Sequence, residues 1–121
     1  MPKTGLFKKA EQAFLKKVTF SEKRLPQITE KKDSAYRTDM ACNHMNQIRN
    51  KFFSMCAAIR TAEEATCAEQ WLNSNRIQNL MIDLDVLVRY SPDWGYANTG
   101  KCPELEQMKD DLTSEKDYHG F

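Results

Sequence analysis

The stretch from Ala41 to Ala62, "ACNHMNQIRNKFFSMCAAIRTA", decides the fold class of this chain. Its apolar residues recur in alternating steps of four and three, which is the heptad spacing of a helix that packs against another helix. They are Ala41, Met45, Ile48, Phe52, Met55, Ile59 and Ala62, and the middle five form the predicted seam. A long seam needs an equally long apolar partner. We therefore interpret it either as the core of one helical bundle or as a surface for self-association.

The seam lies in a long segment that has neither of the usual helix breakers. Glycine occurs only at positions 5, 95, 100 and 120, and proline only at 2, 26, 92 and 103, so residues 27–91 contain none. As a single helix this segment would be about 100 Å long at ~1.5 Å per residue. The chain is therefore either a rod or a set of helices that turn back. Asn73-Ser74-Asn75 is the favoured position for a turn or kink, and the alternative is Thr61 with Glu64, which fits a capping box that restarts a helix.

The N-terminal segment, residues 1–25, is predicted to be a basic amphipathic helix. Its apolar arc contains Leu6, Phe7, Ala10, Ala13, Phe14 and Val18. Its opposite side carries Lys8, Lys9, Gln12 and Lys16, while Leu15 and Lys17 depart from the pattern. Pro26 is expected to separate this helix from residues 26–121.

The C-terminal part completes an all-α prediction. Residues 77–90 fit both a helix and a strand, and we choose a helix because no second strand-like segment is present to pair with it. Residues 91–101 contain Pro92, Gly95 and Gly100 and are predicted to form a loop. Pro103 then starts a helix over 102–114, with acidic residues near its N-terminus.

The charge of the chain is divided between its two halves. Charged residues make up 29% of the chain, mean hydropathy is −0.70 and the net charge is +1. Residues 1–60 carry 13 Lys and Arg against five Asp and Glu, whereas residues 61–121 carry five against 12. The basic half is expected to face an anionic partner: phospholipid, nucleic acid or an acidic protein. The alternative is that the two halves neutralise each other within one fold.

The sequence contains no recognisable catalytic or metal-binding motif. It has no nucleophile elbow, no phosphate-binding glycine loop and no zinc spacing, so we expect no enzyme, catalytic residue, metal or cofactor. The four cysteines, Cys42, Cys56, Cys67 and Cys102, form no C-x-x-C pair. Free thiols in the cytoplasm are favoured over a disulfide-linked helical hairpin. The longest apolar run, Met55 to Ile59, is far too short to cross a membrane.

The basic half suits three kinds of partner to different degrees. A basic amphipathic helix can lie in a membrane interface, with Phe and Leu among the acyl chains and Lys near anionic headgroups. A soluble helical adaptor that binds an acidic protein is the alternative. Nucleic-acid binding ranks third, because aromatic residues are not interleaved with the lysines as a stacking platform.

Several segments, in the same order, resemble the N-BAR domains of the endophilin and amphiphysin type. Residues 20–36, "FSEKRLPQITEKKDSAY", resemble the junction between the N-terminal helix and the first core helix of that family. Residues 48–65, "IRNKFFSMCAAIRTAEEA", resemble the middle of that core helix. Residues 90–94, "YSPDW", resemble its Tyr-x-Pro-Asp-Trp loop, and residues 100–112, "GKCPELEQMKDDL", stand where the second core helix begins.

The resemblance implies a peripheral membrane protein that binds curved anionic membranes, as in endocytosis, and that forms a homodimer or pairs with a related helical partner. It implies an incomplete antiparallel BAR-like bundle or coiled coil, because the family has three long helices. By position, the residues at the membrane would be Phe7, Lys8, Lys9, Phe14, Leu15, Lys16 and Lys17. The seam residues Met45, Ile48, Phe52, Met55 and Ile59 would face the bundle or the dimer partner.

Overall fold

A computed structural model describes residues 3–89 and 102–121 of the chain. These residues form five helices and no strand, which confirms the all-α prediction. The helices are α1 (Gly5–Glu30), α2 (Ser34–Ala57), α3 (Ala62–Asn73), α4 (Asn75–Arg89) and α5 (Pro103–His119). The predicted loop at 91–101 lies outside the described residues.

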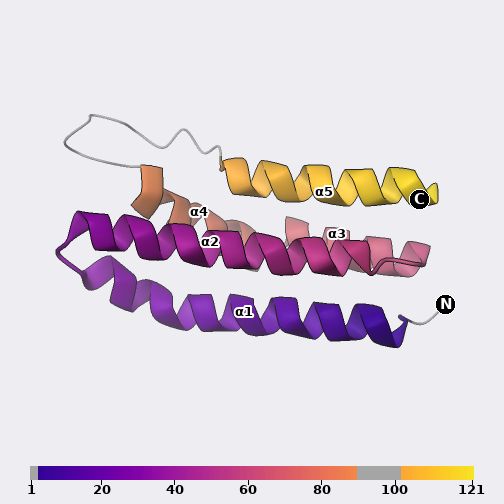
Figure 1. The fold of residues 1–121 in the computed structure, drawn as a ribbon, viewed down its shortest axis with the longest axis horizontal. Coiled ribbons are helices and arrows are strands. Elements are labelled where there is room, and N and C mark those ends of the chain that lie inside the picture. The colour runs from indigo at the N-terminus through magenta and orange to yellow at the C-terminus, as the bar shows by residue number, and fades with distance from the viewer. Residues whose placement is uncertain (1–2, 90–101) are drawn as a thin grey trace.

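The helices form an antiparallel bundle in which α3 and α4 follow one another and together take the place of one helix (Figure 1). Helix α1 packs along α2, and α2 also packs against α4 and α5. Helix α3 contacts α5, so the helices surround one shared core. The beginning of α1 and the end of α5 lie at the same end of the bundle (Figure 1). Successive helices thus run in an up-and-down order.

Pro26 does not separate two helices. Helix α1 continues through it to Glu30, and the backbone N–H of Lys31 caps the end by donating to the carbonyl of Ile28. Proline inside a helix removes one backbone hydrogen bond, yet α1 continues for four residues past the exposed Pro26. The predicted boundary between residues 25 and 26 therefore falls inside α1.

The segment from 27 to 89 is not a rod, because it turns back twice, at residues 31–33 and 58–61, and breaks once more at Ser74 (Figure 1). Helix α2 ends at Ala57, and α3 starts with the predicted capping box: the Thr61 side chain accepts from the Glu64 N–H, and the Glu64 carboxylate accepts from the Thr61 N–H. Ser74 is extended and separates α3 from α4, as predicted for Asn73-Ser74-Asn75. The predicted helix at 77–90 is present as α4, although Tyr90 lies outside the described residues.

The predicted seam lies in the core of the bundle. Its five residues are completely inaccessible to solvent: Met45, Ile48, Phe52, Met55 and Ile59. They are covered by other helices of the same chain, for example where Phe14 of α1 meets Phe52 edge-on at 5.5 Å between ring centroids. In this fold the seam is therefore intramolecular and offers no surface to a second copy.

Helix α5 covers the last side of the core and is longer than expected. Pro103 occupies its first turn as predicted, and Met108 and Leu112 are buried against α2 and α3. The helix runs to His119 instead of stopping near 114, and Gly120 ends it in the left-handed conformation with φ 74°. Glycine is the residue that adopts this cap without strain.

Candidate functional site

The membrane site predicted on α1 is divided by the fold into a buried and an exposed part. Phe7 and Phe14 are fully buried, and Leu15 is half-buried against the core. While α1 remains packed in the bundle, the two phenylalanines therefore cannot reach lipid. Their amphipathic pattern is accounted for by packing inside the chain.

The predicted lysines lie on the outside of α1. Lys8, Lys9 and Lys16 are exposed, and Lys17 is half-buried with its Nζ 5.0 Å from the centre of the Phe20 ring. Lys23 extends the same row, so that Lys9, Lys16 and Lys23 recur every seven residues along one side of the helix. We define these three lysines, with the exposed Phe20 beside them, as the α1 ridge.

The lysines of the α1 ridge carry uncompensated charge. Within residues 3–89 and 102–121, no carboxylate lies at ion-pair distance from Lys9, Lys16 or Lys23. Two of the three glutamates of α1 point elsewhere: Glu11 is buried and pairs with Lys3 at 3.0 Å, and Glu22 binds an arginine of α4 at 2.7 Å. The ridge therefore presents positive charge to solvent.

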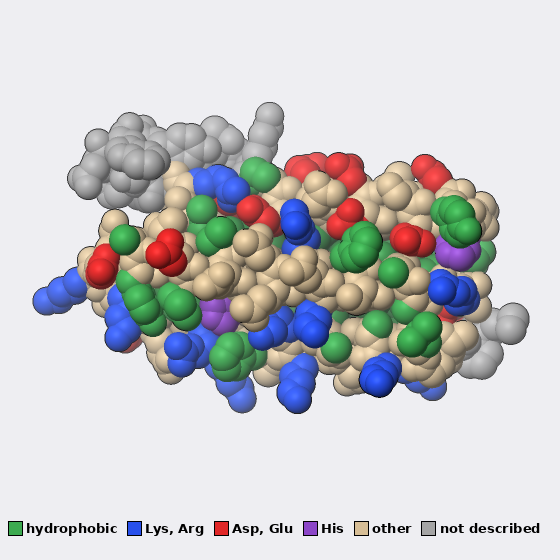
Figure 2. Space-filling model, viewed as in Figure 1, with side chains coloured by type: hydrophobic (Ala, Val, Ile, Leu, Met, Phe, Trp, Pro, Cys, Tyr) green, Lys and Arg blue, Asp and Glu red, His purple; other side chains and the backbone are tan. Residues whose placement is uncertain are grey.

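Apolar side chains accompany the lysines on this side of the bundle. Leu6 is 61% exposed and Phe20 is 48% exposed. Leu6 and Lys9 line an open groove of about 370 Å³ between α1 and the end of α2. Figure 2 shows blue side chains gathered along the edge formed by α1 and red ones along the opposite edge formed by α5. The charge division of the sequence is thus also a division in space.

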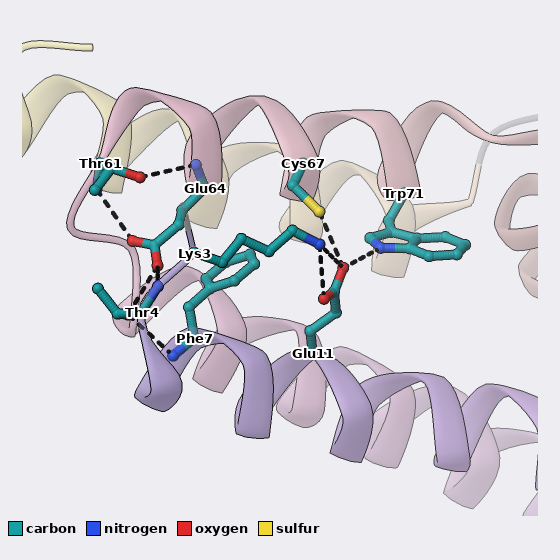
Figure 3. A network of polar contacts seen from close by, with 8 residues as sticks. All are labelled: Lys3, Thr4, Phe7, Glu11, Thr61, Glu64, Cys67 and Trp71. Atoms are coloured by element: carbon teal, nitrogen blue, oxygen red, sulfur yellow. Dashed lines mark hydrogen bonds and ion pairs between the residues drawn. The ribbon is translucent and has the colours of Figure 1, made fainter. Parts of the chain in front are cut away.

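A buried polar network ties the start of the chain to α3 (Figure 3). Glu64 is completely buried and accepts hydrogen bonds from the Thr4 N–H and hydroxyl at 2.7 and 2.8 Å, and from the Arg60 and Thr61 N–H groups at 2.7 and 3.1 Å. Burial alone would raise the pKa of Glu64, but these hydrogen bonds outweigh it and hold the pKa below its ordinary value. The capping box predicted from the sequence is therefore also a tertiary contact.

Glu11 forms the second half of this network, which we call the N-terminal clasp. Its carboxylate accepts from Lys3 Nζ at 3.0 Å, Trp71 Nε1 at 2.8 Å and Cys67 Sγ at 3.0 Å. Burial would raise the pKa of Glu11, but these three donors lower it below the ordinary value. This role of Glu11 was not predicted from the sequence. The available signal was the position of Glu11 on the apolar arc, between Phe7 and Phe14.

A second charged cluster joins α4 to α5. Oxygen and sulfur atoms of Asp85, Cys102 and Glu104 all lie within 4.8 Å of one another, a spacing that metal ligands share. The Arg89 guanidinium, however, contacts Asp85 and binds both oxygens of Glu104 at 2.9 and 3.0 Å. A cation is therefore already present among these carboxylates, and the cluster is best described as a buried ion pair that joins two helices.

One pair of side chains has the spacing of a nucleophile and its base. Ser21 Oγ lies 2.7 Å from His44 Nδ1, and Phe20 stacks on the histidine ring. Burial, followed by the positive charges of Lys17 and Arg24, lowers the pKa of His44, so the ring is neutral at pH 7. Ser21 is completely inaccessible to solvent, and no substrate can reach its hydroxyl in this fold. The pair acts as a hydrogen bond between α1 and α2.

Among the described residues, no helix has the length and apolar character needed to cross a bilayer. No protein family, no curated protein and no solved structure matches this chain. The N-BAR resemblance therefore remains a sequence-based prediction. What the structure identifies is an antiparallel helical bundle with one basic edge.

Proposed function

We propose that this protein binds anionic phospholipid membranes peripherally, as a folded bundle, through the α1 ridge. The observation that carries this proposal is the row of three exposed, unpaired lysines at Lys9, Lys16 and Lys23. The exposed Leu6 and Phe20 lie on the same helix and supply apolar contacts at the level of the headgroups. Phe7 and Phe14 support the helix from within the core.

The expected binding is weak and sensitive to salt. Each lysine near an anionic surface contributes about 1 kcal/mol. Five lysines of α1, namely Lys8, Lys9, Lys16, Lys17 and Lys23, would together contribute about 4 to 5 kcal/mol, which corresponds to dissociation constants of roughly 0.2 to 1 mM. Screening over ~8 Å at physiological ionic strength reduces this further.

An acidic protein would also be attracted to the lysines, and it is the second candidate. The exposed Leu6 and Phe20 favour lipid, because apolar side chains beside lysines match the boundary between headgroups and acyl chains. The two candidates differ in a simple respect. Binding to vesicles requires no other protein and depends on the fraction of anionic lipid.

Co-sedimentation with vesicles tests the proposal. The full chain is mixed with phosphatidylcholine vesicles that contain or lack phosphatidylserine, at low and at physiological salt. We expect binding only with phosphatidylserine, stronger at low salt, and reduced about tenfold or more when Lys9, Lys16 and Lys23 are all changed to Gln, since ~3 kcal/mol of attraction is removed.

A matched control separates the ridge from net charge. The triple variant Lys31→Gln, Lys32→Gln and Lys109→Gln removes three exposed lysines that lie outside α1. It should bind more strongly than the ridge variant. Absence of binding at low salt, or equal loss in both triple variants, would contradict a specific role for the ridge.

A further inference from the structure

A hollow lies at the end of the bundle where α1 turns into α2, opposite the end that holds the N-terminus (Figure 1). We call it the turn pocket. Its volume is about 500 Å³, and its walls come from the last two turns of α1, the connection and the first turn of α2. The residues that line it are Arg24, Gln27, Ile28, Glu30, Lys31 and Tyr36. The Nζ of Lys31 lies 5.8 Å from the centre of the Tyr36 ring, so a cation and an aromatic ring meet in the pocket.

The Arg24 guanidinium has no partner within the fold. Its Nε is buried, yet nothing in the part of the chain that the structure describes accepts a hydrogen bond from it. Arg76 and Arg89, by contrast, each bind both oxygens of a glutamate on another helix. A buried donor without an acceptor destabilises a fold, and such groups in proteins commonly bind water or an ion. Arg24 is therefore available to an acceptor that comes from outside the chain.

The pocket offers further hydrogen-bond donors. The side chains of Gln27, Lys31 and Tyr36 are exposed, and none of them forms a hydrogen bond within the described part of the chain. Glu30 supplies an acidic side chain in the wall. Residues 24–37 as a whole carry four Lys and Arg against two Asp and Glu, a net charge of +2. A positively charged hollow rich in donors suits an anion that has several acceptor oxygens.

We propose that the turn pocket binds a phosphate monoester, with Arg24 as the main contact. The planar guanidinium presents parallel N–H groups that match two oxygens of a phosphate. The third terminal oxygen remains for Lys31 or for the Tyr36 hydroxyl, whereas a carboxylate has only two oxygens to share. Because Nε is covered in the free protein, binding turns the guanidinium towards the hollow, a movement that the long arginine side chain permits.

Two features at this end of α1 oppose an anion. Glu30 is one, and the other is the negative pole of the helix dipole at the last carbonyl groups. The carbonyls of Ile28 and Lys31 already accept hydrogen bonds, from the Lys31 N–H and from the Arg37 guanidinium. The remaining attraction grows with the charge of the anion. A phosphate monoester, which is a dianion above its second pKa of about 6, is therefore favoured over a carboxylate.

The proposal does not rest on membrane binding, because a phosphate monoester can be soluble or can be the headgroup of a lipid. Glycerol 3-phosphate and phosphatidic acid carry the same group in these two forms. Phosphatidylserine is a phosphodiester and serves as the matched lipid that lacks this group.

Titration followed by ¹H–¹⁵N NMR tests the pocket in solution. The full chain is titrated with glycerol 3-phosphate at neutral pH and constant ionic strength, with acetate as the monoanion control. We expect the Arg24 Nε–H signal, identified by its absence from the spectrum of Arg24→Gln, to shift until the site is saturated, and acetate to bind more weakly. Backbone N–H signals of residues 27–36 report the affinity of every variant. Arg24→Gln should weaken binding about tenfold or more, and Glu30→Gln should strengthen it about two- to fivefold.

The matched control is Arg49→Gln. Arg49 is a half-buried arginine of α2 that has no ion-pair partner in the described part of the chain, and it lines a different groove, with Phe53 and Asp111. This variant should bind glycerol 3-phosphate like the wild type. Circular dichroism shows whether each variant is folded. Since Arg24 makes no hydrogen bond within the described residues, Arg24→Gln should retain the helical spectrum.

Vesicle co-sedimentation identifies the source of the phosphate group. The variant Lys9→Gln, Lys16→Gln and Lys23→Gln is used, so that the α1 ridge contributes little. Binding to phosphatidylcholine vesicles with phosphatidic acid, and not to vesicles of matched surface charge with phosphatidylserine, would show that the pocket accepts a lipid headgroup. Binding of glycerol 3-phosphate without such retention on vesicles would show that it accepts a soluble ester.

Two results would overturn the proposal. One is the absence of a saturable shift with glycerol 3-phosphate together with equal retention on the two kinds of vesicle. The other is equal weakening by Arg24→Gln and Arg49→Gln, since the effect would then follow net charge rather than the pocket. Neither result bears on the α1 ridge, which is tested by phosphatidylserine vesicles and the wild-type chain.

Discussion

Substituting Glu64 by Gln tests whether the N-terminal clasp holds the bundle together. The change preserves the size of the side chain but replaces one carboxylate oxygen by an NH₂ group. In the wild type, one oxygen accepts from the Arg60 and Thr61 N–H groups and the other from Thr4. In the variant, the NH₂ group must therefore face donors on one of these two sides.

The expected loss of stability follows from these contacts. A hydrogen bond to a charged acceptor contributes about 1.5 to 3 kcal/mol, and a neutral one about 0.5 to 1.5 kcal/mol. The variant loses the bond from the Thr4 N–H and weakens the others, while the Thr4 hydroxyl can turn to accept from the new NH₂ group. We expect a decrease of about 2 to 3 kcal/mol in the free energy of unfolding, which lowers Tm by about 8 to 15 °C.

Urea unfolding at pH 7 followed by circular dichroism measures this loss. Because the pKa of Glu64 is lower in the folded state than its ordinary value of 4.5, the carboxylate stabilises the fold above that value. This contribution decreases as the pH falls below 4.5 and is lost once the pH passes the folded pKa. The difference between wild type and variant should therefore be constant at neutral pH and shrink in acid.

The matched control is Glu30→Gln, the same chemical change at an exposed position in the last turn of α1. It removes a negative charge from the negative end of the helix dipole and should leave stability unchanged or slightly raised. A loss below about 0.5 kcal/mol for Glu64→Gln would refute the reasoning. A loss that does not change between pH 7 and acid would show that ionisation of Glu64 is not the cause.

Three further predictions concern the core, the second ion pair and the thiols. Phe14→Ala should lower the free energy of unfolding by about 3 to 5 kcal/mol, because Phe14 is fully buried against Phe52. Leu6→Ala, at an exposed position, should lower it far less. Equal losses in urea unfolding would contradict the burial of Phe14. Arg89→Met should lower the free energy of unfolding by about 3 kcal/mol or more at pH 7, since it leaves Asp85 and Glu104 without their shared cation. A second change, Glu104→Gln, should restore part of this loss. Burial raises the pKa of the Cys56 thiol to about 12, so a disulfide reagent at pH 8 should modify Cys42 well before Cys56 in the folded protein, and equal rates would argue against this burial.

Local signals were enough to predict most of the helix boundaries. The capping box at Thr61, the break at Ser74 and the helix start at Pro103 each depend on a few neighbouring residues, and all three are present in the structure. Pro26 is the exception. A proline predicts a helix end only when nothing else holds the backbone, and here α1 is packed along α2 on both sides of it.

The sequence by itself determined that the chain is helical, that the seam from Met45 to Ile59 is apolar, and that basic and acidic residues are separated. It did not determine what covers the apolar stripes. The pattern that places Phe7 and Phe14 on one side of a helix suits a lipid surface, a second copy or the core of the same chain equally well, because each removes the same apolar area from water. Only the tertiary structure decided that α1 packs on α2, so that both phenylalanines are buried and the lysines face outward. It also paired Glu11 and Glu64 with donors up to 60 residues away, contacts that no local spacing encodes.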